Sequence, residues 1–134
     1  MNGSSEEINK KLVLQAFDLL FNQRDFSAAE RLWSPDYIQH SAHIPPGREG
    51  LFNIVKSRAA SRYENQLAAA NGDYVMLHGR FSQRGPGKPN WVVVDIVRLE
   101  KDLLAEHWDV IQEEATRDQS KSGLPMFGDK FPDG

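Results

Sequence analysis

The hydrophobic pattern of this chain changes near its middle, and this change is the strongest constraint on the fold. Residues 5–62 carry apolar side chains at helical spacing, whereas residues 65–112 consist of strand-like runs separated by short turn signals. Helices followed by a series of strands are typical of an α+β domain. A chain of 134 residues suits one such domain. We expect the domain to cover residues 1–114 and an extended tail to cover residues 115–134.

Three helices are predicted in the first half of the chain. The first covers residues 5–21, and Ser4 and Glu7 have the spacing of a capping box at its start. The second is short and ends before Pro35, because proline is not tolerated in a helix interior. The third covers residues 48–62 and follows a loop that contains two prolines and a glycine. Each helix is expected to bury one apolar face.

Four strands are predicted in the second half of the chain, and a short one lies earlier. Their expected ranges are residues 37–40, 66–70, 74–83, 91–99 and 103–112. The last four follow one another through short turns, so neighbouring strands must pair antiparallel. We therefore predict an antiparallel meander that curls over the three helices.

The tail changes character from polar to rich in Gly, Pro and Phe. Two interpretations remain open for it. Met126, Phe127 and Phe131 could dock on the domain or on a partner subunit, or the tail could be disordered.

The register of the last hairpin decides which polar side chains share a face. A two-residue turn at 101–102 places Asp95 opposite Trp108, and it leaves His107 and Asp109 on the other face. One added turn residue, or one bulge, brings Asp95 onto the same face as His107 and Asp109. The sequence leaves both arrangements open.

Both faces of this hairpin are rich in Val, Ile and Leu, which indicates burial on two sides. We expect a cavity or core on one face and a second copy of the chain on the other. A carboxylate among apolar neighbours loses hydration, which raises its pKa and suits it to proton transfer near neutral pH. Asp95 and Asp109 are therefore candidate acid–base residues. The alternative is a structural bridge from either aspartate to Arg98 or to a histidine.

Three histidines are further candidates for catalysis. His107 lies in the same hairpin, His78 lies in the middle of a predicted strand, and His40 precedes the proline-containing loop. A histidine that points into the cavity could orient or polarise a substrate carbonyl. The alternative for His78 is a structural role, as a hydrogen-bonded histidine in the core or in an interface. The same alternative applies to His40. The candidate substrate-binding residues are Tyr37, Phe17, Phe52, Trp108, Trp91 and Arg98.

Several classes of function find no support in the sequence. The chain has no cysteine, which excludes disulfides and thiolate metal sites and fits a reducing cytosol. The net charge of −3 argues against non-specific binding to nucleic acid, and no apolar run is long enough to span a membrane. We find no metal-binding motif, phosphate-binding loop or serine-hydrolase elbow. We therefore expect no metal and no cofactor, and a cytoplasmic protein.

Three segments resemble the SnoaL-like family of the nuclear transport factor 2-like superfamily. Residues 37–40, followed by Pro-Pro-Gly-Arg-Glu-Gly, resemble the segment before the third helix of that family. Residues 95–100 and 106–112 are similar to its last hairpin, and Pro-Met-Phe at 125–127 resembles its tails. The family often has Asp-Gly at the hairpin turn, where this chain has Lys-Asp at 101–102, so this turn is expected to be strained or longer.

The resemblance implies a cone-shaped half-barrel, usually dimeric, with a cavity for a small organic ligand. Its enzymes include polyketide cyclases that perform aldol condensation, ketosteroid isomerases, dehydratases and epoxide hydrolases. The leading hypothesis is thus a cofactor-independent enzyme that uses Asp/His acid–base chemistry on a carbonyl compound. A non-catalytic ligand-binding or protein-interaction module is the alternative. Epoxide hydrolysis would need Arg98 between Asp95 and Asp109.

Overall fold

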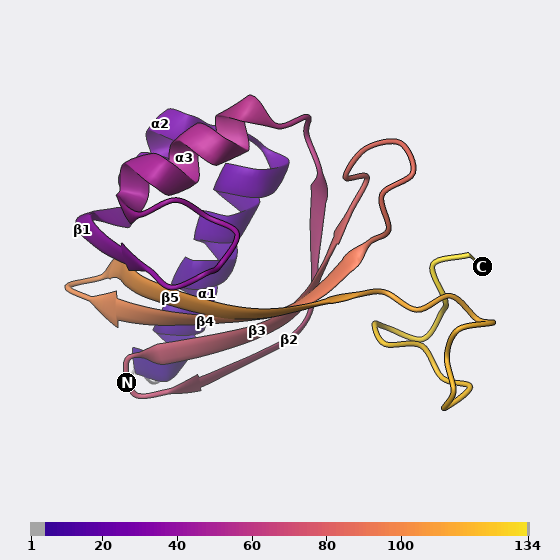
Figure 1. The fold of residues 1–134 in the computed structure, drawn as a ribbon. Helices are drawn as coiled ribbons and strands as arrows, with labels where there is room; N and C mark the ends of the chain where they lie inside the picture. Colours follow the sequence, from indigo (N-terminus) through magenta and orange to yellow (C-terminus); the bar gives the residue numbers. More distant parts are fainter. Residues whose placement is uncertain (1–4, 134) are drawn as a thin grey trace.

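The computed structural model describes residues 5–133, and they form a helical layer on one face of a curled sheet (Figure 1). The helical elements are α1 (Ser5–Phe17), the π-helix η1 (Asp18–Asn22), α2 (Phe26–Glu30) and α3 (Gly47–Ser57). The strands are β1 (Trp33–Gln39), β2 (Arg62–Asn71), β3 (Tyr74–Ser82), β4 (Trp91–Glu100) and β5 (Leu103–Glu113). The α+β prediction is confirmed.

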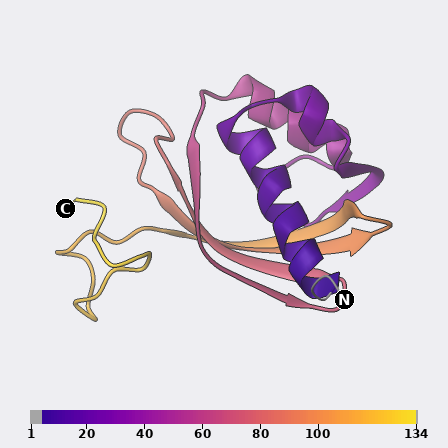
Figure 2. The same ribbon diagram turned by 180° about the vertical axis from the view of Figure 1, so that it is seen from behind.

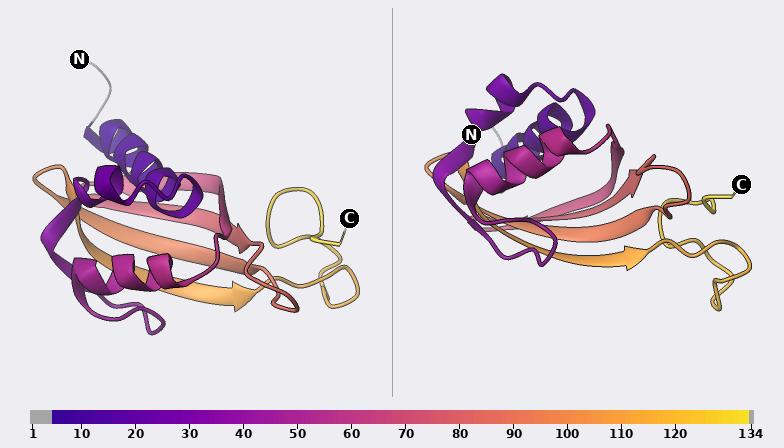
Figure 3. Two further views of the ribbon diagram at one scale, coloured as in Figure 1. Left: turned by 90° about the horizontal axis from the view of Figure 1, so that it is seen from above. Right: turned by 45° about the horizontal axis from the view of Figure 1, so that its top comes forward.

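The sheet has the strand order β1-β5-β4-β3-β2. β2 to β5 form the predicted antiparallel meander, and β1 adds a parallel edge strand beside β5. Proline is tolerated in β1 because edge strands leave one row of amides unpaired. Figure 2 shows α1 running across the sheet, and Figure 3 shows that the helices cover only its concave face. The sheet stays open and does not close into a barrel.

The main core lies between the helices and the concave face of the sheet. Its fully buried members include Val13 and Leu20 from the N-terminal helices and Val75, Leu77 and Leu104 from the sheet. Because side chains alternate along a strand, the neighbouring positions point to the convex face. No helix in residues 5–133 is long and apolar enough to cross a bilayer.

Several element boundaries differ from the sequence predictions. The first helix passes into the π-helix η1 after Phe17, and Ser4 of the proposed capping box lies outside the described residues. α3 ends at Ser57, five residues before the predicted end at residue 62, because the chain is extended from Arg58 onward and leads into β2. Residues 58–61 therefore form a short connection beside the sheet.

The last hairpin combines a tight turn with a bulge. Lys101 and Asp102 both have positive φ, of 53° and 62°, which is the conformation of a type I′ turn without its usual glycine. The turn is therefore strained rather than long. The register shifts by one residue between Arg98 and Leu99, so that Ala105 is the extra residue on β5. This bulge selects the second of the two registers considered from the sequence.

Residues 115–133 of the tail form no helix or strand, but two of the aromatic rings in this segment are buried. Phe127 and Phe131 are each 7% exposed. Phe127 packs against the Arg80 guanidinium, with 4.4 Å between that group and the ring centre, and it lies beside the ring of His78. The tail thus docks on the convex side of β3, opposite the helices.

Candidate functional site

Three ionisable side chains meet on the concave face of the last hairpin. The bulged register places Asp95 directly opposite Asp109, and His107 lies two residues before Asp109 on the same face. One ligand atom from each of the three side chains lies within 4.8 Å of the others. Without the bulge, Asp95 would have faced Trp108 and pointed away from both partners. A single inserted residue therefore creates this cluster, which we call the acidic end of the site.

A chain of hydrogen bonds connects Asp95 to the edge strand β1. His107 Nε2 lies 2.7 Å from Asp95 Oδ1, and His107 Nδ1 lies 2.7 Å from Gln39 Oε1. Gln39 Oε1 also accepts a hydrogen bond from the Ser41 amide, and Gln39 Nε2 donates one to the Tyr37 hydroxyl. Parallel pairing of β1 with β5 sets Gln39 beside His107. The imidazole is therefore held from both sides.

These contacts determine how the protons are arranged. Because Gln39 Oε1 is an acceptor, His107 Nδ1 must be the donor in that contact. Nε2 of the neutral imidazole would then be an acceptor, so the contact with the Asp95 carboxylate requires one shared proton. The pair is either a neutral acid beside a neutral imidazole or a carboxylate beside an imidazolium. In both forms it stores one proton.

Asp95 is in an environment that disfavours its charge. Its side chain is only 3% exposed, and Oδ2 has no hydrogen-bond partner among the described residues. Burial raises the pKa of the Asp95 carboxyl above its ordinary value, the contact with His107 opposes this shift, and the nearby Asp109 adds to it. A raised carboxyl pKa next to a second, more exposed carboxylate is typical of proton-transfer sites.

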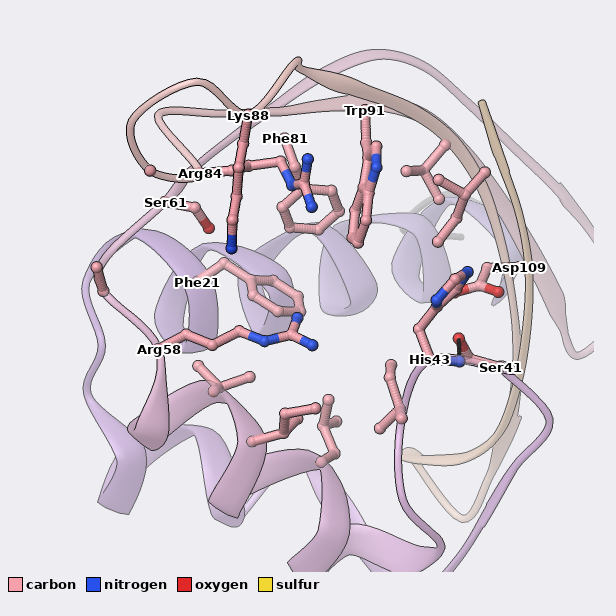
Figure 4. A pocket seen from close by; sticks show the side chains of 18 of the residues that line it. Phe21, Ser41, His43, Arg58, Ser61, Phe81, Arg84, Lys88, Trp91 and Asp109 are labelled. Carbon is pink, nitrogen blue, oxygen red and sulfur yellow. Dashed lines mark hydrogen bonds between the residues drawn. The ribbon is translucent and has the colours of Figure 1, made fainter. Parts of the chain in front are cut away.

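Asp95 and Asp109 line a cavity of about 510 Å³ between the sheet and α3. This volume is in the range of pockets that bind small organic ligands. Its apolar walls come from α3, η1 and the sheet, and they include Phe21, Leu51, Ile54, Phe81, Trp91 and Ile111. Figure 4 shows Asp109, Ser41 and His43 on one side of the cavity and Arg58, Arg84 and Lys88 on the opposite side. The cavity is thus apolar with two polar ends of opposite charge.

The acidic end also contains the ligand types that a divalent cation uses. In the arrangement seen here, however, both ring nitrogens of His107 are engaged, with Asp95 and Gln39. A metal ion would have to replace the Asp95–His107 hydrogen bond. The observed donor set therefore fits proton storage better than metal binding.

Three predicted site residues lie on the convex face instead. His40 stacks on Trp108 with 4.8 Å between the ring centres, and its Nε2 lies 2.7 Å from Glu106 Oε2. Arg98 Nε donates to Glu106 Oε1 at 2.9 Å. Arg98 is three residues from Asp95, and strand alternation sends them to opposite faces even in the bulged register. An Asp-Arg-Asp network through Arg98, as epoxide hydrolysis would need, is therefore absent from the described residues.

The other predicted site residues divide between the core and the tail contact. Phe17 and Phe52 pack on Trp33 in the core, and His78 lies beside Phe127 of the tail. Tyr37 supports Gln39 through its hydroxyl, and burial raises the pKa of that phenol, so it stays protonated. Of the predicted substrate-binding residues, Trp91 is the one that lines the cavity.

The sequence analysis missed two groups of residues. Gln39 was not singled out, because its role depends on the parallel pairing of β1, which short-range patterns do not reveal. Alternation from Tyr37 to Gln39 was the available signal, since it places both on one face. The basic residues of the cavity, Arg58, Arg84 and Lys88, were also missed, because they come from segments that the sequence presents as a helix end and a loop.

Comparison with solved structures shows the same fold in other proteins. A candidate ketosteroid isomerase from Kribbella flavida has a TM-score of 0.75 at 17% identity, and the match covers 96% of this chain and 98% of that one. AclR, a candidate hydroxylase from Streptomyces galilaeus, has a TM-score of 0.66 at 22% identity, with 80% and 90% covered. An LEH-like epoxide hydrolase from M. tuberculosis has a TM-score of 0.69 at 13% identity, with 90% and 91% covered. These likenesses concern the fold.

The sequence itself matches a family description over most of its length. No curated protein matches the chain in a sequence comparison. The family described as "SnoaL-like domain" matches residues 13–107, a segment that runs from α1 to the middle of β5 and includes Asp95 and His107. On this match and the fold, the chain belongs to the SnoaL-like domain family.

Proposed function

We propose that this protein is an enzyme that transfers a proton at a carbon atom next to a carbonyl group of a small organic substrate. The observation that carries this proposal is the buried Asp95–His107 pair, which stores one proton beside Asp109 at one end of an apolar cavity. Isomerisation, aldol cyclisation and dehydration all begin with such a proton transfer.

In the proposed mechanism, Asp109 is the base. Its carboxylate lines the cavity and is less buried than Asp95, so it can contact the substrate. The C–H bond breaks, the proton moves to Asp109, and the electron pair moves onto the carbonyl oxygen to give an enolate. Asp109 then gives this proton, or one that it has exchanged with solvent, to a carbon atom of the enolate, and the electron pair returns from the oxygen to form the new C–H bond.

The Asp95–His107 pair is proposed to control the charge beside Asp109. Because the pair holds one proton, Asp95 does not add a second full negative charge beside Asp109. Gln39 keeps the imidazole in one tautomer, so the stored proton stays on the side of Asp95. Asp95, His107 and Gln39 are thus positioning residues that set the charge beside Asp109.

Exchange of carbon-bound protons in D₂O tests the proposal without knowledge of the substrate. We expect wild-type protein to catalyse deuterium incorporation next to the carbonyl of at least one ketone, such as 4-phenylbutan-2-one, measured by proton NMR. Asp109→Asn should lower the catalysed rate about 10²- to 10⁴-fold, which is the usual contribution of a general base. The melting temperature should remain close to that of wild type.

Two further variants complete the test. Asp36→Asn changes an exposed acid on β1 and should leave exchange unchanged, which makes it the matched control. Asp95→Asn should shift the pH profile of exchange rather than only lower the rate, since it removes the stored proton. Exchange that continues at the wild-type rate in Asp109→Asn, together with a pH profile that Asp95→Asn leaves unchanged, would refute the mechanism.

A non-catalytic binding function is the second candidate. The observation that favours it is that Asp95 and His107 are paired with each other and buried, as expected for a structural pair. The same NMR samples distinguish the enzyme from the binding protein. If wild-type protein binds ketones of a panel but catalyses proton exchange in none of them, the binding function is favoured.

The convex face supports a proposal of self-association. Val94 and Val110 are adjacent cross-strand partners, and they are 39% and 69% exposed. An apolar patch on an open sheet face is typical of an interface between subunits. We infer a homodimer through this face; sedimentation velocity should show a dimer for wild type and a monomer for Val110→Glu. A cytoplasmic location stays a prediction.

A further inference from the structure

The cavity has a cationic end whose charges are not neutralised by the protein. Arg58 lies just after α3, while Arg84 and Lys88 lie in the loop between β3 and β4, and all three line the cavity. Figure 4 shows these three side chains on one side of the cavity, across from Asp109. None of the three forms a salt bridge with a carboxylate in residues 5–133.

Arg84 is held in place rather than extended into solvent. Its guanidinium lies 3.4 Å from the centre of the Trp91 ring, and Nη1 donates to the Pro89 carbonyl at 2.7 Å. Burial lowers the pKa of Arg84, the nearby Arg58 charge adds to this, and Glu113 opposes it. Arg58 and Arg84 both line this end of the cavity and repel each other there, and a bound anion would offset that repulsion.

The backbone that carries Arg58 is also fixed. Arg24 donates from one arm of its guanidinium to the Val55 carbonyl at 3.3 Å and from the other to the Arg58 carbonyl at 3.4 Å. These contacts tie the end of α3 to the segment after η1. The Arg58 side chain itself makes no hydrogen bond within the described residues, so it is available to a ligand. The Arg84 side chain and the backbone at Arg58 are thus held in place at the cationic end.

We propose that the ligand of this cavity is an organic anion with an apolar body, whose carboxylate or phosphate group binds Arg58, Arg84 and Lys88. The inference rests on the proposed function for its orientation. With the anionic group at the cationic end, the apolar body lies along Phe21, Phe81 and the α3 side chains. The opposite end of the ligand, with the reacting carbon, then lies at Asp109, where a second negative charge would be repelled.

Binding of matched small molecules tests this inference. The probes are 4-phenylbutanoate, its neutral amide 4-phenylbutanamide, and 4-phenylbutyl phosphate, and affinity is measured from tryptophan fluorescence and from NMR shifts. We expect the carboxylate or the phosphate to bind at least about tenfold more tightly than the amide, because charge-assisted hydrogen bonds form only with an anion. Comparison of the two anions identifies the preferred group. Raising the salt concentration should reduce the difference.

Substitutions at the cationic end locate the effect. The double variant Arg58→Gln, Lys88→Gln changes two exposed side chains and should reduce the preference for an anion without loss of fold, with Arg84 left to bind it. Lys11→Gln, on an exposed position of α1, is the matched control and should keep the full preference. Equal affinity for anion and amide in wild type would overturn the inference, as would a preference that the double variant retains undiminished.

The result can be separated from that of the proposed function. Binding is measured in wild type and in Asp109→Asn, and it does not require turnover. A preference for anions in both proteins, with no proton exchange, would support the cationic end and refute the enzyme. Proton exchange that depends on Asp109, with no preference for anions, would support the enzyme and refute the cationic end.

Discussion

Replacing Gln39 with methionine should destabilise the protein without leaving a cavity, because the two side chains have similar length and volume. Two buried donors lose their acceptor in this variant: His107 Nδ1, now 2.7 Å from Gln39 Oε1, and the Ser41 amide, 2.9 Å from the same atom. His107 and Ser41 are 5% and 6% exposed, so water cannot easily replace the lost acceptor. Each unsatisfied donor costs about 1–3 kcal/mol.

We therefore expect Gln39→Met to lower the free energy of unfolding by about 3 kcal/mol, with a fall in melting temperature of roughly 10 °C. Urea denaturation followed by tryptophan fluorescence measures the first quantity. Nitrogen-15 NMR of the imidazole measures the tautomer, which should lose its strict preference for a proton on Nδ1. Gln39→Glu retains an acceptor at this place and should recover most of the stability.

The matched control is Gln112→Met, which changes an exposed glutamine on β5. It should alter neither the stability nor the tautomer. If Gln39→Met is as stable as wild type and its imidazole spectrum is unchanged, Gln39 does not hold His107, and the derived proton arrangement at Asp95 is wrong.

Two further predictions follow from burial. The pKa of Asp95 is raised above 3.8 in the folded state, so the folded protein favours the protonated carboxyl. The contribution of this carboxyl to the free energy of unfolding is therefore complete below pH 3.8 and is lost as the pH rises through the folded-state pKa. The stability of wild type relative to Asp95→Asn should therefore fall as the pH rises above about 4, by at most about 1.4 kcal/mol per pH unit. A difference in urea denaturation that does not change with pH would contradict this. Gly79→Ala would place a Cβ atom against the ring and hydroxyl of Tyr63, so it should cost about 2 kcal/mol in a melting experiment; an unchanged melting temperature would show that Tyr63 moves freely.

The sequence by itself determined the class of fold and the order of its elements. Periodicity is a local property, so the helical stripes and the alternating strands could be recognised without tertiary structure. The resemblance of residues 37–40 and of the last hairpin to SnoaL-like proteins was specific enough to predict the family, and the match over residues 13–107 confirms it. The two aspartates could be predicted as acid–base residues because a carboxylate among Val, Ile and Leu residues loses hydration, which raises its pKa.

Only the tertiary structure decided which of these residues meet. The bulge at Ala105 lies where β5 also pairs with β1, and one residue of register moves a side chain from one face of the sheet to the other. It brings Asp95 to His107 and Asp109, while strand alternation keeps His40, Arg98 and Trp108 on the convex face. The roles of Gln39 and of the cationic end could not be predicted from the sequence for the same reason. They depend on contacts between segments that are distant in the chain, and such contacts leave no local pattern.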